Sequence, residues 1–216
     1  PILAMHQYKK YWRKWGMKYD HGHAFLEIVS EKKPKHFLEI GVFTGVTARN
    51  TCELLNDIHG KDFQYTGLDL FEDYVPEHDH EIAPNMIRGN QQKFSNPLKH
   101  IVYNLILREQ LNSLNSVTKF LKKFKNQVEL VKGDSKKTLS EIEIEKYDMI
   151  FVDGGHSFET VNFELQLIMS KCKKDCLVLV DDYDHQVASG VKKAVDQIVS
   201  EKKLKLNIFS GRFAQI

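Results

Sequence analysis

The stretch Glu39-Ile40-Gly41-Val42-Phe43-Thr44-Gly45 decides the fold. It begins at the end of an apolar run, residues 36–40, that has the length of a buried strand. After it, Ala48, Cys52 and Leu55 recur at helical spacing. The two glycines allow the backbone to turn sharply and to approach a ligand closely. The stretch therefore predicts a strand, a tight turn and a helix whose N-terminus opens at the turn.

The same alternation of apolar runs and helical spacing continues along the chain. Further strands are predicted at residues 64–70, 128–131, 148–152, 176–180, 204–209 and 213–216. Strands that alternate with helices pair in parallel, so we expect an α/β sandwich: a mostly parallel seven-stranded sheet with helices on both faces. Ligands of such sheets bind beyond the carboxyl ends of the strands. Polar residues that directly follow each strand are therefore the candidates for a site.

The length of 216 residues fits one domain, residues 1–216. Two segments interrupt the alternation. Residues 1–33 are predicted to form an N-terminal helical cap, and residues 72–112 a helical lid or substrate-binding insertion, because unusually long connections are often functional.

Charge and composition limit the classes of partner that can be expected. The net charge of +2 gives no reason to expect nucleic acid. Three cysteines indicate reduced thiols rather than a disulfide framework. No apolar run approaches the roughly 20 residues that span a bilayer, so no membrane partner is expected and a cytoplasmic location is predicted. The aromatic N-terminus is compatible with a homo-oligomer.

Acidic residues lie at the ends of three successive predicted strands. Glu39 adjoins the glycine turn, where a carboxylate would repel a pyrophosphate but suits an ammonium group. Asp69 ends the second strand, where an acid can bind ribose hydroxyls. Asp134 follows the third strand, where a side chain can meet an adenine amino group. The turn matches neither the Gly-x-Gly-x-x-Gly dinucleotide fingerprint nor a phosphate-binding P-loop.

This ordered set resembles the class I methyltransferases that use S-adenosylmethionine (SAM). The resemblance covers about residues 36–216 and rests on four motifs: Glu39-x-Gly41-x-x-x-Gly45, Gly67-Leu68-Asp69, Gly133-Asp134-Ser135 and Tyr147-Asp148-x-Ile150-x-Val152-Asp153. It implies a Rossmann-like fold. The residues that it implies for cofactor binding are Glu39, Gly41, Thr44, Gly45, Asp69, Asp134, Ser135 and Asp153.

A second resemblance concerns the chemistry. Asp153-Gly154-Gly155-His156 and the pair Asp181-Asp182 resemble the metal-dependent sugar and macrolide O-methyltransferases and their cephalosporin-hydroxylase-like relatives. That family often has Glu-Asp at the pair, so Asp181 is a departure. The resemblance implies that Asp153, Asp181 and Asp182 bind Mg²⁺, and that His156 is the general base. Mg²⁺ prefers oxygen ligands, and a cation helps a weakly acidic hydroxyl to lose its proton.

The sequence thus predicts a Mg²⁺-dependent O-methyltransferase that acts on a small acceptor, such as a sugar or a natural-product moiety. Two alternatives stay open. One is metal-independent methyl transfer to nitrogen or to a macromolecule. The other is a SAM-binding protein without methyl-transfer activity.

Overall fold

The fold was analysed in a computed structural model that describes residues 7–13, 15–71, 95–106, 110–185 and 188–216. Its centre is a seven-stranded sheet in the order β3-β2-β1-β4-β5-β7-β6. The strands are β1 (His36–Ile40), β2 (Gln64–Asp69), β3 (Val128–Lys132), β4 (Met149–Val152), β5 (Leu177–Val180), β6 (Asn207–Phe209) and β7 (Phe213–Gln215). This sheet confirms the predicted fold class.

The sheet is parallel from β3 through β5 and antiparallel at its far edge. β1 pairs with β2 and β4, and the two flanking pairs, β2 with β3 and β4 with β5, run in the same direction. β7 lies between β5 and β6 and pairs antiparallel with both. The carboxyl ends of five parallel strands therefore meet at one edge, beside the amino end of β7.

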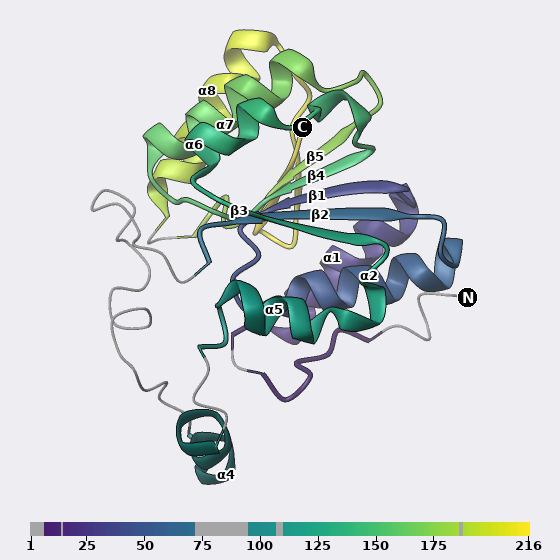
Figure 1. The fold of residues 1–216 in the computed structure, drawn as a ribbon. Helices are drawn as coiled ribbons and strands as arrows, with labels where there is room; N and C mark the ends of the chain where they lie inside the picture. Colours follow the sequence, from purple (N-terminus) through teal and green to yellow (C-terminus); the bar gives the residue numbers. More distant parts are fainter. Residues whose placement is uncertain (1–6, 14, 72–94, 107–109, 186–187) are drawn as a thin grey trace.

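Helices cover both faces of the sheet (Figure 1). The helices are α1 (Tyr19–Lys32), α2 (Val46–His59), α4 (Pro97–Ile101), α5 (Leu114–Phe120), α6 (Ser135–Thr138), α7 (Phe158–Lys171) and α8 (Ser189–Lys202). A π-helical turn, η3 (Val102–Ile106), continues α4, and single 3₁₀ turns lie at Lys122–Phe124, Leu139–Glu141 and Ile144–Lys146.

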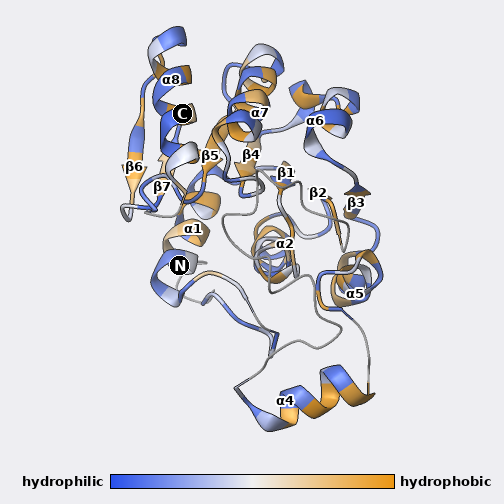
Figure 2. Ribbon diagram, turned by 90° about the vertical axis from the view of Figure 1, so that its left-hand side faces the viewer, coloured by the Kyte–Doolittle hydropathy of each residue, from blue (hydrophilic) through white to orange (hydrophobic). Residues whose placement is uncertain are grey.

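Strand alternation sorts the core into two layers. Phe37 and Phe151 belong to the layer under α1, α2 and α5, whereas Leu38 and Ile150 belong to the layer under α7 and α8. In Figure 2 the apolar sides of the flanking helices turn toward the sheet. Because successive strand residues point to opposite faces, Glu39 lies in the same layer as Phe37.

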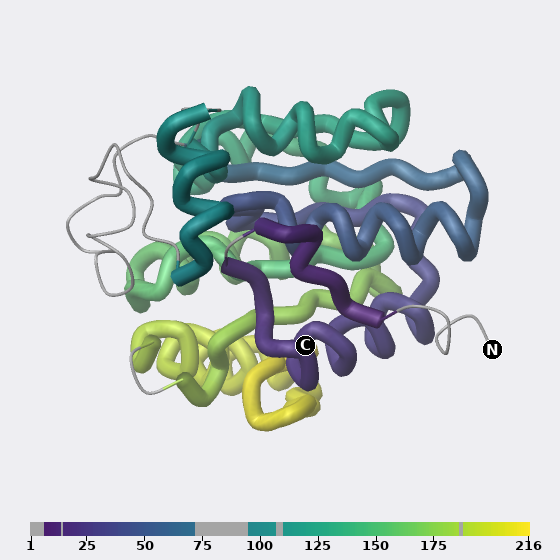
Figure 3. Tube along the Cα trace, turned by 90° about the horizontal axis from the view of Figure 1, so that it is seen from below, coloured from purple at the N-terminus to yellow at the C-terminus, as the bar shows by residue number. Residues whose placement is uncertain are grey.

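Of the two segments predicted to interrupt the alternation, the first supplies α1 to the α1–α2–α5 layer, and the described part of the second includes α4 and η3. Among the described residues before β1, helix occurs only in α1; the purple N-terminal trace runs across this side of the molecule beside α4 (Figure 3). The rings of Trp12 and Tyr103 lie 5.8 Å apart and connect the two segments. Of the predicted insertion 72–112, residues 72–94 and 107–109 lie outside the described residues. Among the helices that are described, none is long and apolar enough to cross a membrane.

Candidate active site

The residues that follow the parallel strands form a continuous row at the carboxyl edge of the sheet. Each extends the ladder by one backbone hydrogen bond, from Gly41 to Leu68, from Asp153 to Ile40 and from Asp181 to Val152, at 2.8–2.9 Å. Gly133 likewise donates to the Asp69 carbonyl at 3.0 Å. The predicted motifs, which are far apart in sequence, are therefore neighbours in space.

The glycine turn is packed tightly against β4. Gly41 has φ = +94°, and a Cβ atom there would lie 2.1 Å from the Asp153 carbonyl oxygen. Gly45, with φ = +77°, is the N-cap of α2. Thr44 is buried, and its hydroxyl donates to the Trp15 carbonyl at 3.3 Å. The turn thus joins the N-terminal segment to the end of β4.

Glu39 is fully buried and only half of its carboxyl group is bonded. The Tyr65 hydroxyl donates to Oε2 at 2.5 Å, whereas Oε1 has no hydrogen-bond partner. Burial raises the pKa of Glu39 to about 8; the Tyr65 hydrogen bond opposes the rise and the nearby Asp69 charge adds to it. A buried acceptor without a partner is costly, so this atom is suited to a ligand that donates to it.

Asp69 supports the turn with both carboxylate oxygens. Oδ2 accepts from the Phe43 amide at 2.8 Å, and Oδ1 accepts from the Phe71 amide at 2.6 Å. Asp134 is the N-cap of α6 and accepts from the Lys136 amide at 3.0 Å, with Ser135 as the first residue of that helix. In this structure both acids therefore order backbone beside the predicted cofactor site.

Asp153, His156 and Asp182 converge beyond β4 and β5. One ligand atom from each lies within 4.8 Å of the other two. His156 Nε2 is 3.3 Å from Asp182 Oδ2, and both side chains are largely buried. Asp182 has φ = +56°, an uncommon left-handed conformation. His156 directly precedes Ser157, the N-cap of α7, so its backbone is positioned by the start of that helix.

Asp181 is near this group but bonds to another partner. The Arg212 guanidinium binds it with two nitrogens, Nε to Oδ1 and Nη2 to Oδ2, the latter at 2.6 Å. Arg212 Nη2 is also 3.0 Å from Asp182 Oδ1. Among the described residues, the structure therefore groups His156 with two of the three predicted metal ligands and places Asp181 on the arginine.

Arg212 is not among the site residues that the sequence predicts. The residue follows the tight turn between β6 and β7, where the Arg212 amide donates to the Phe209 carbonyl at 3.0 Å. Ser210 and Gly211 both have positive φ, as a two-residue type I′ hairpin turn requires. The dipeptide was a local signal for a hairpin, but no local signal places that hairpin beside β5.

Charges within the cluster shift its pKa values in opposite directions. Burial, together with the negative charges of Asp181 and Asp182, raises the pKa of Asp153 well above its usual range. Burial acts in the same direction on Asp182, but the His156 hydrogen bond and the Arg212 charge outweigh it, so the pKa of Asp182 is lowered. A bound cation would relieve the repulsion that raises the pKa of Asp153.

The donor set fits a divalent cation. Carboxylates of Asp153 and Asp182 supply the hard oxygen ligands that Mg²⁺ prefers, and their separation allows one ion to contact both. The imidazole of His156 could bind a softer divalent ion directly. The chemistry and spacing of these side chains are therefore compatible with a divalent metal ion.

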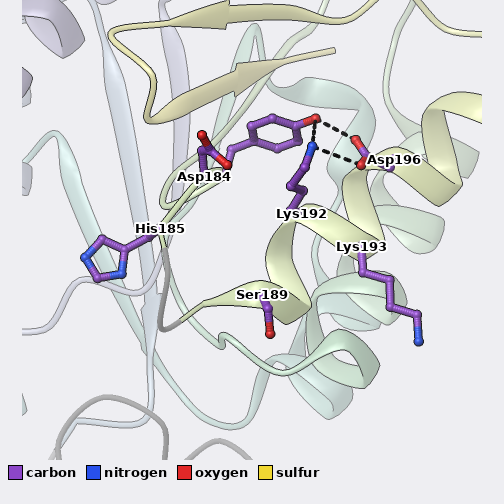
Figure 4. Close-up of a pocket in the computed structure, with 7 residues that line it drawn as sticks. Asp184, His185, Ser189, Lys192, Lys193 and Asp196 are labelled. Carbon is purple, nitrogen blue, oxygen red and sulfur yellow. Dashed lines mark hydrogen bonds and ion pairs between the residues drawn. The ribbon is translucent and has the colours of Figure 1, made fainter.

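A cleft of about 480 Å³ is lined by residues 183–185, which follow the acid pair in sequence, and by the first turns of α8. Figure 4 shows Lys192 directed toward Asp196, and the Lys192 ammonium is 3.1 Å from Asp196 Oδ2. The Tyr183 hydroxyl donates to Asp196 Oδ1 at 2.6 Å and accepts from Lys192 at 2.8 Å. These contacts fix the segment after Asp182 to α8. His185 points away from them (Figure 4).

Comparison with solved structures identifies the same fold in several methyltransferases. The SAH-bound methyltransferase PaMTH1 of Podospora anserina has a TM-score of 0.63 at 16% identity, covering 99% of this chain and 86% of that one. The O-methyltransferase NovP has 0.62 at 17%, covering 89% and 78%. The calicheamicin methyltransferase CalS11 has 0.60 at 17%, covering 93% and 80%. At these identities the likeness shows the fold alone.

Sequence comparison supplies the family. No curated protein sequence matches the chain. Residues 38–183, about two thirds of its length, match the family model described as a methyltransferase domain. This range contains the glycine turn, the acids at the ends of β2 and β3, and the cluster after β4 and β5. The chain belongs to this methyltransferase domain family, and it is a class I SAM-dependent methyltransferase.

Proposed function

We propose that this methyltransferase methylates a hydroxyl group of a small acceptor, such as a sugar or a natural-product moiety, with the help of a divalent cation, Mg²⁺. The convergence of Asp153, His156 and Asp182 beside the glycine turn carries the proposal. The Asp153 carbonyl contacts the turn that would hold the methyl donor. The donor and the acid cluster would therefore meet at one place on the sheet edge.

The methyl donor would bind along the row of strand ends. Glu39 supports this because its unpaired Oε1 suits the ammonium group of SAM, and Gly41 supports it because only a residue without Cβ fits against β4. The other proposed contacts are Thr44, Gly45, Asp69, Asp134, Ser135 and Asp153. When bound, SAM supplies an electrophilic methyl group on a positively charged sulfur.

The acid cluster would prepare the acceptor. Asp153 and Asp182 would hold the cation, with Asp181 as the third ligand if Arg212 releases it; when bound, the ion lowers the pKa of the acceptor hydroxyl. His156 Nε2, which contacts Asp182, would take the hydroxyl proton. The imidazole would thus carry the proton away while the oxygen gains the methyl group, and the donor sulfur would leave as the neutral thioether of S-adenosylhomocysteine.

Similar structures support a small acceptor. CalS11 is described as a TDP-rhamnose 3′-O-methyltransferase, and NovP as an O-methyltransferase. In this chain the cleft lined by residues 183–185, which directly follow Asp182 in sequence, would offer a place for such an acceptor. The side chains that line it have both charge signs, with Lys192 and Lys193 opposite in charge to Asp184 and Asp196.

Methyl transfer from labelled SAM to a panel of glycosyl and phenolic acceptors tests the proposal. We expect product with Mg²⁺ and at least about a 100-fold loss of turnover in EDTA or in His156→Ala, within the range usual for a general base. His59→Ala is the matched control, because His59 lies on α2 away from the cluster and contacts the Lys33 carbonyl.

Each outcome has a separate meaning. Full turnover in EDTA would contradict the metal, and wild-type turnover of His156→Ala would contradict the base. A methylated nitrogen in the product would support the N-methyltransferase alternative. Binding of S-adenosylhomocysteine (SAH) without transfer to any acceptor would favour a binding protein.

A further inference from the structure

Arg212 satisfies Asp181 completely. Oδ1 of Asp181 accepts from Arg212 Nε and, at 2.8 Å, from the Asp182 amide, while Oδ2 accepts from Arg212 Nη2 at 2.6 Å. The Asp181 side chain is 1% exposed, so water has almost no access to either oxygen. A metal ion can therefore use Asp181 only by displacing the guanidinium.

The backbone holds Arg212 in this position. Val180 pairs with Ala214 in the antiparallel ladder, so the residues after β5 face the residues before β7. The Tyr183 amide donates to the Arg212 carbonyl at 2.9 Å, and the hairpin turn closes on the Arg212 amide. The guanidinium is thus held beside the acid pair by backbone contacts on both sides.

The Arg212 guanidinium also contacts Asp182, which belongs to the Asp153–His156–Asp182 cluster. Arg212 Nη2 contacts Asp182 Oδ1, while Asp182 Oδ2 faces His156. Fixed beside two carboxylates of the proposed metal site, a unit positive charge would repel a divalent ion and occupy the oxygen atoms that would bind it.

We propose that Arg212 is an internal cation that competes with the divalent metal for the Asp181–Asp182 pair and so weakens metal binding. This inference rests on the proposed function for the existence of the metal site. When all three carboxylates are ionised, the cluster with Arg212 in place carries two net negative charges, one fewer than it would carry without the guanidinium. Without it, a third carboxylate becomes available as a ligand.

A purely structural role predicts the opposite result. If Arg212 only fastened β7 to β5, its removal would loosen the acid pair and weaken metal binding. Competition predicts tighter binding. The sign of the change in metal affinity therefore separates the two roles, independently of turnover.

Isothermal titration of Mn²⁺ into the metal-free full chain measures that sign. We expect Arg212→Gln to bind Mn²⁺ at least about tenfold more tightly than wild type, because it loses a like charge and gains a ligand. Arg212→Lys keeps the charge but loses the two-nitrogen contact, so we expect a smaller gain. Lys205→Gln, an exposed charge loss before β6, should leave Mn²⁺ affinity unchanged.

A second substitution identifies the ligand. Adding Asp181→Asn to Arg212→Gln should remove most of the gain, because Asp181 is the carboxylate that Arg212 withholds. Thermal unfolding checks that each variant is folded. If Arg212→Gln does not fold, Arg212→Lys decides the matter, and tighter Mn²⁺ binding supports the proposal.

Unchanged or weaker Mn²⁺ binding in the folded variants, or no binding to wild type and variant alike, would overturn it. Failure of the proposed function appears in a different measurement. A wild type that methylates fully in EDTA contradicts the metal's role in turnover, whereas the effect of Arg212 is measured on Mn²⁺ affinity alone.

Discussion

Tyr65 and Glu39 form a buried pair between neighbouring strands, with the phenol hydroxyl 2.5 Å from Glu39 Oε2. Glu39 pairs with Gly67 across β1 and β2, so the Tyr65 side chain reaches it diagonally along the same face. With a pKa of about 8, the carboxyl group is mostly protonated at neutral pH. The pair therefore links the stability of the protein without cofactor to pH.

Glu39→Gln should remove that link. The folded state raises the pKa of Glu39 from 4.5 to about 8, so its favourable contribution is complete below pH 4.5 and is lost as pH rises through 8. Between these values, wild type should lose stability relative to Glu39→Gln by up to about 1.4 kcal/mol per pH unit. Urea unfolding of both proteins at pH 5, 6, 7 and 8 measures the difference. A difference that does not change with pH contradicts the prediction.

Glu53→Gln is the matched control for that series. Burial acts to raise the pKa of Glu53, but hydrogen bonds from Lys123 and Arg49 outweigh it and lower the pKa. Its contribution is therefore present above its unfolded pKa and is lost only in acid. The stability difference between wild type and Glu53→Gln should stay level from pH 6 to 8.

Gly41→Ala should disrupt the turn and the cofactor site together. The new Cβ would lie 2.1 Å from a backbone oxygen of Asp153, which no side-chain rotation relieves. We expect at least a tenfold loss of SAH affinity by calorimetry, together with lower stability in urea. Gly60→Ala is the control, because Gly60 has φ = +64° but no atom within 4 Å of the added Cβ. With ψ = −125°, Gly60 lies in a region that residues with a Cβ atom rarely adopt, so the change should cost about 1–3 kcal/mol from the backbone conformation alone and keep SAH affinity.

Ser157→Ala should impair the positioning of His156 without affecting cofactor binding. The Ser157 hydroxyl accepts from the Thr160 amide at 3.2 Å and caps α7 directly after His156. Its loss should cost about 1 kcal/mol of stability. It should also lower turnover severalfold at unchanged SAH affinity.

The N-cap of α5 provides the control for Ser157→Ala. Ser113 accepts from the Ser116 amide at 3.1 Å, so Ser113→Ala should cost similar stability while turnover stays at the wild-type level. Equal losses of turnover in both variants would show that the effect is global rather than local to His156.

Tyr8→Phe should detach the N-terminal segment from α2. The buried Tyr8 hydroxyl contacts Thr47 Oγ1 and accepts from the Met17 amide, both at 3.1 Å. Leaving these buried groups without a partner should cost about 1–3 kcal/mol in urea unfolding. Tyr19→Phe, at a residue that is 64% exposed, should not change stability.

All seven strands could be predicted because each is a short apolar run with a polar stop. The exact ends of the strands did not all follow from the sequence. The sixth strand was expected from residue 204 but begins at Asn207, because Lys203 is left-handed and Leu204 still bonds to the Val199 carbonyl. A helix end that continues into an apolar run hides where the strand begins.

The candidate site could be predicted only as far as parallel strands define it. The acids and His156 directly follow strands whose order is set by the βαβ repeat, so their convergence follows from local patterns. Arg212 reaches the site through the antiparallel β6–β7 hairpin, in which β7 pairs with β5, and that pairing depends on the whole sheet. The sequence therefore predicts three acids that bind one metal cation, whereas in the structure the Arg212 guanidinium already contacts two of these acids.

The place of β7 between β5 and β6 also bears on biosynthesis. Every residue of the glycine turn and of the Asp153–His156 loop leaves the ribosome before residues 207–215 do. A nascent chain can thus form the cofactor half of the sheet while Asp181 still lacks its arginine. Because a buried unpaired carboxylate is costly, the residues at the end of β5 should become ordered only when the β6–β7 hairpin pairs with β5. The last described strands would then act as the closing step of folding, and the acid cluster would be assembled after the site that binds the methyl donor.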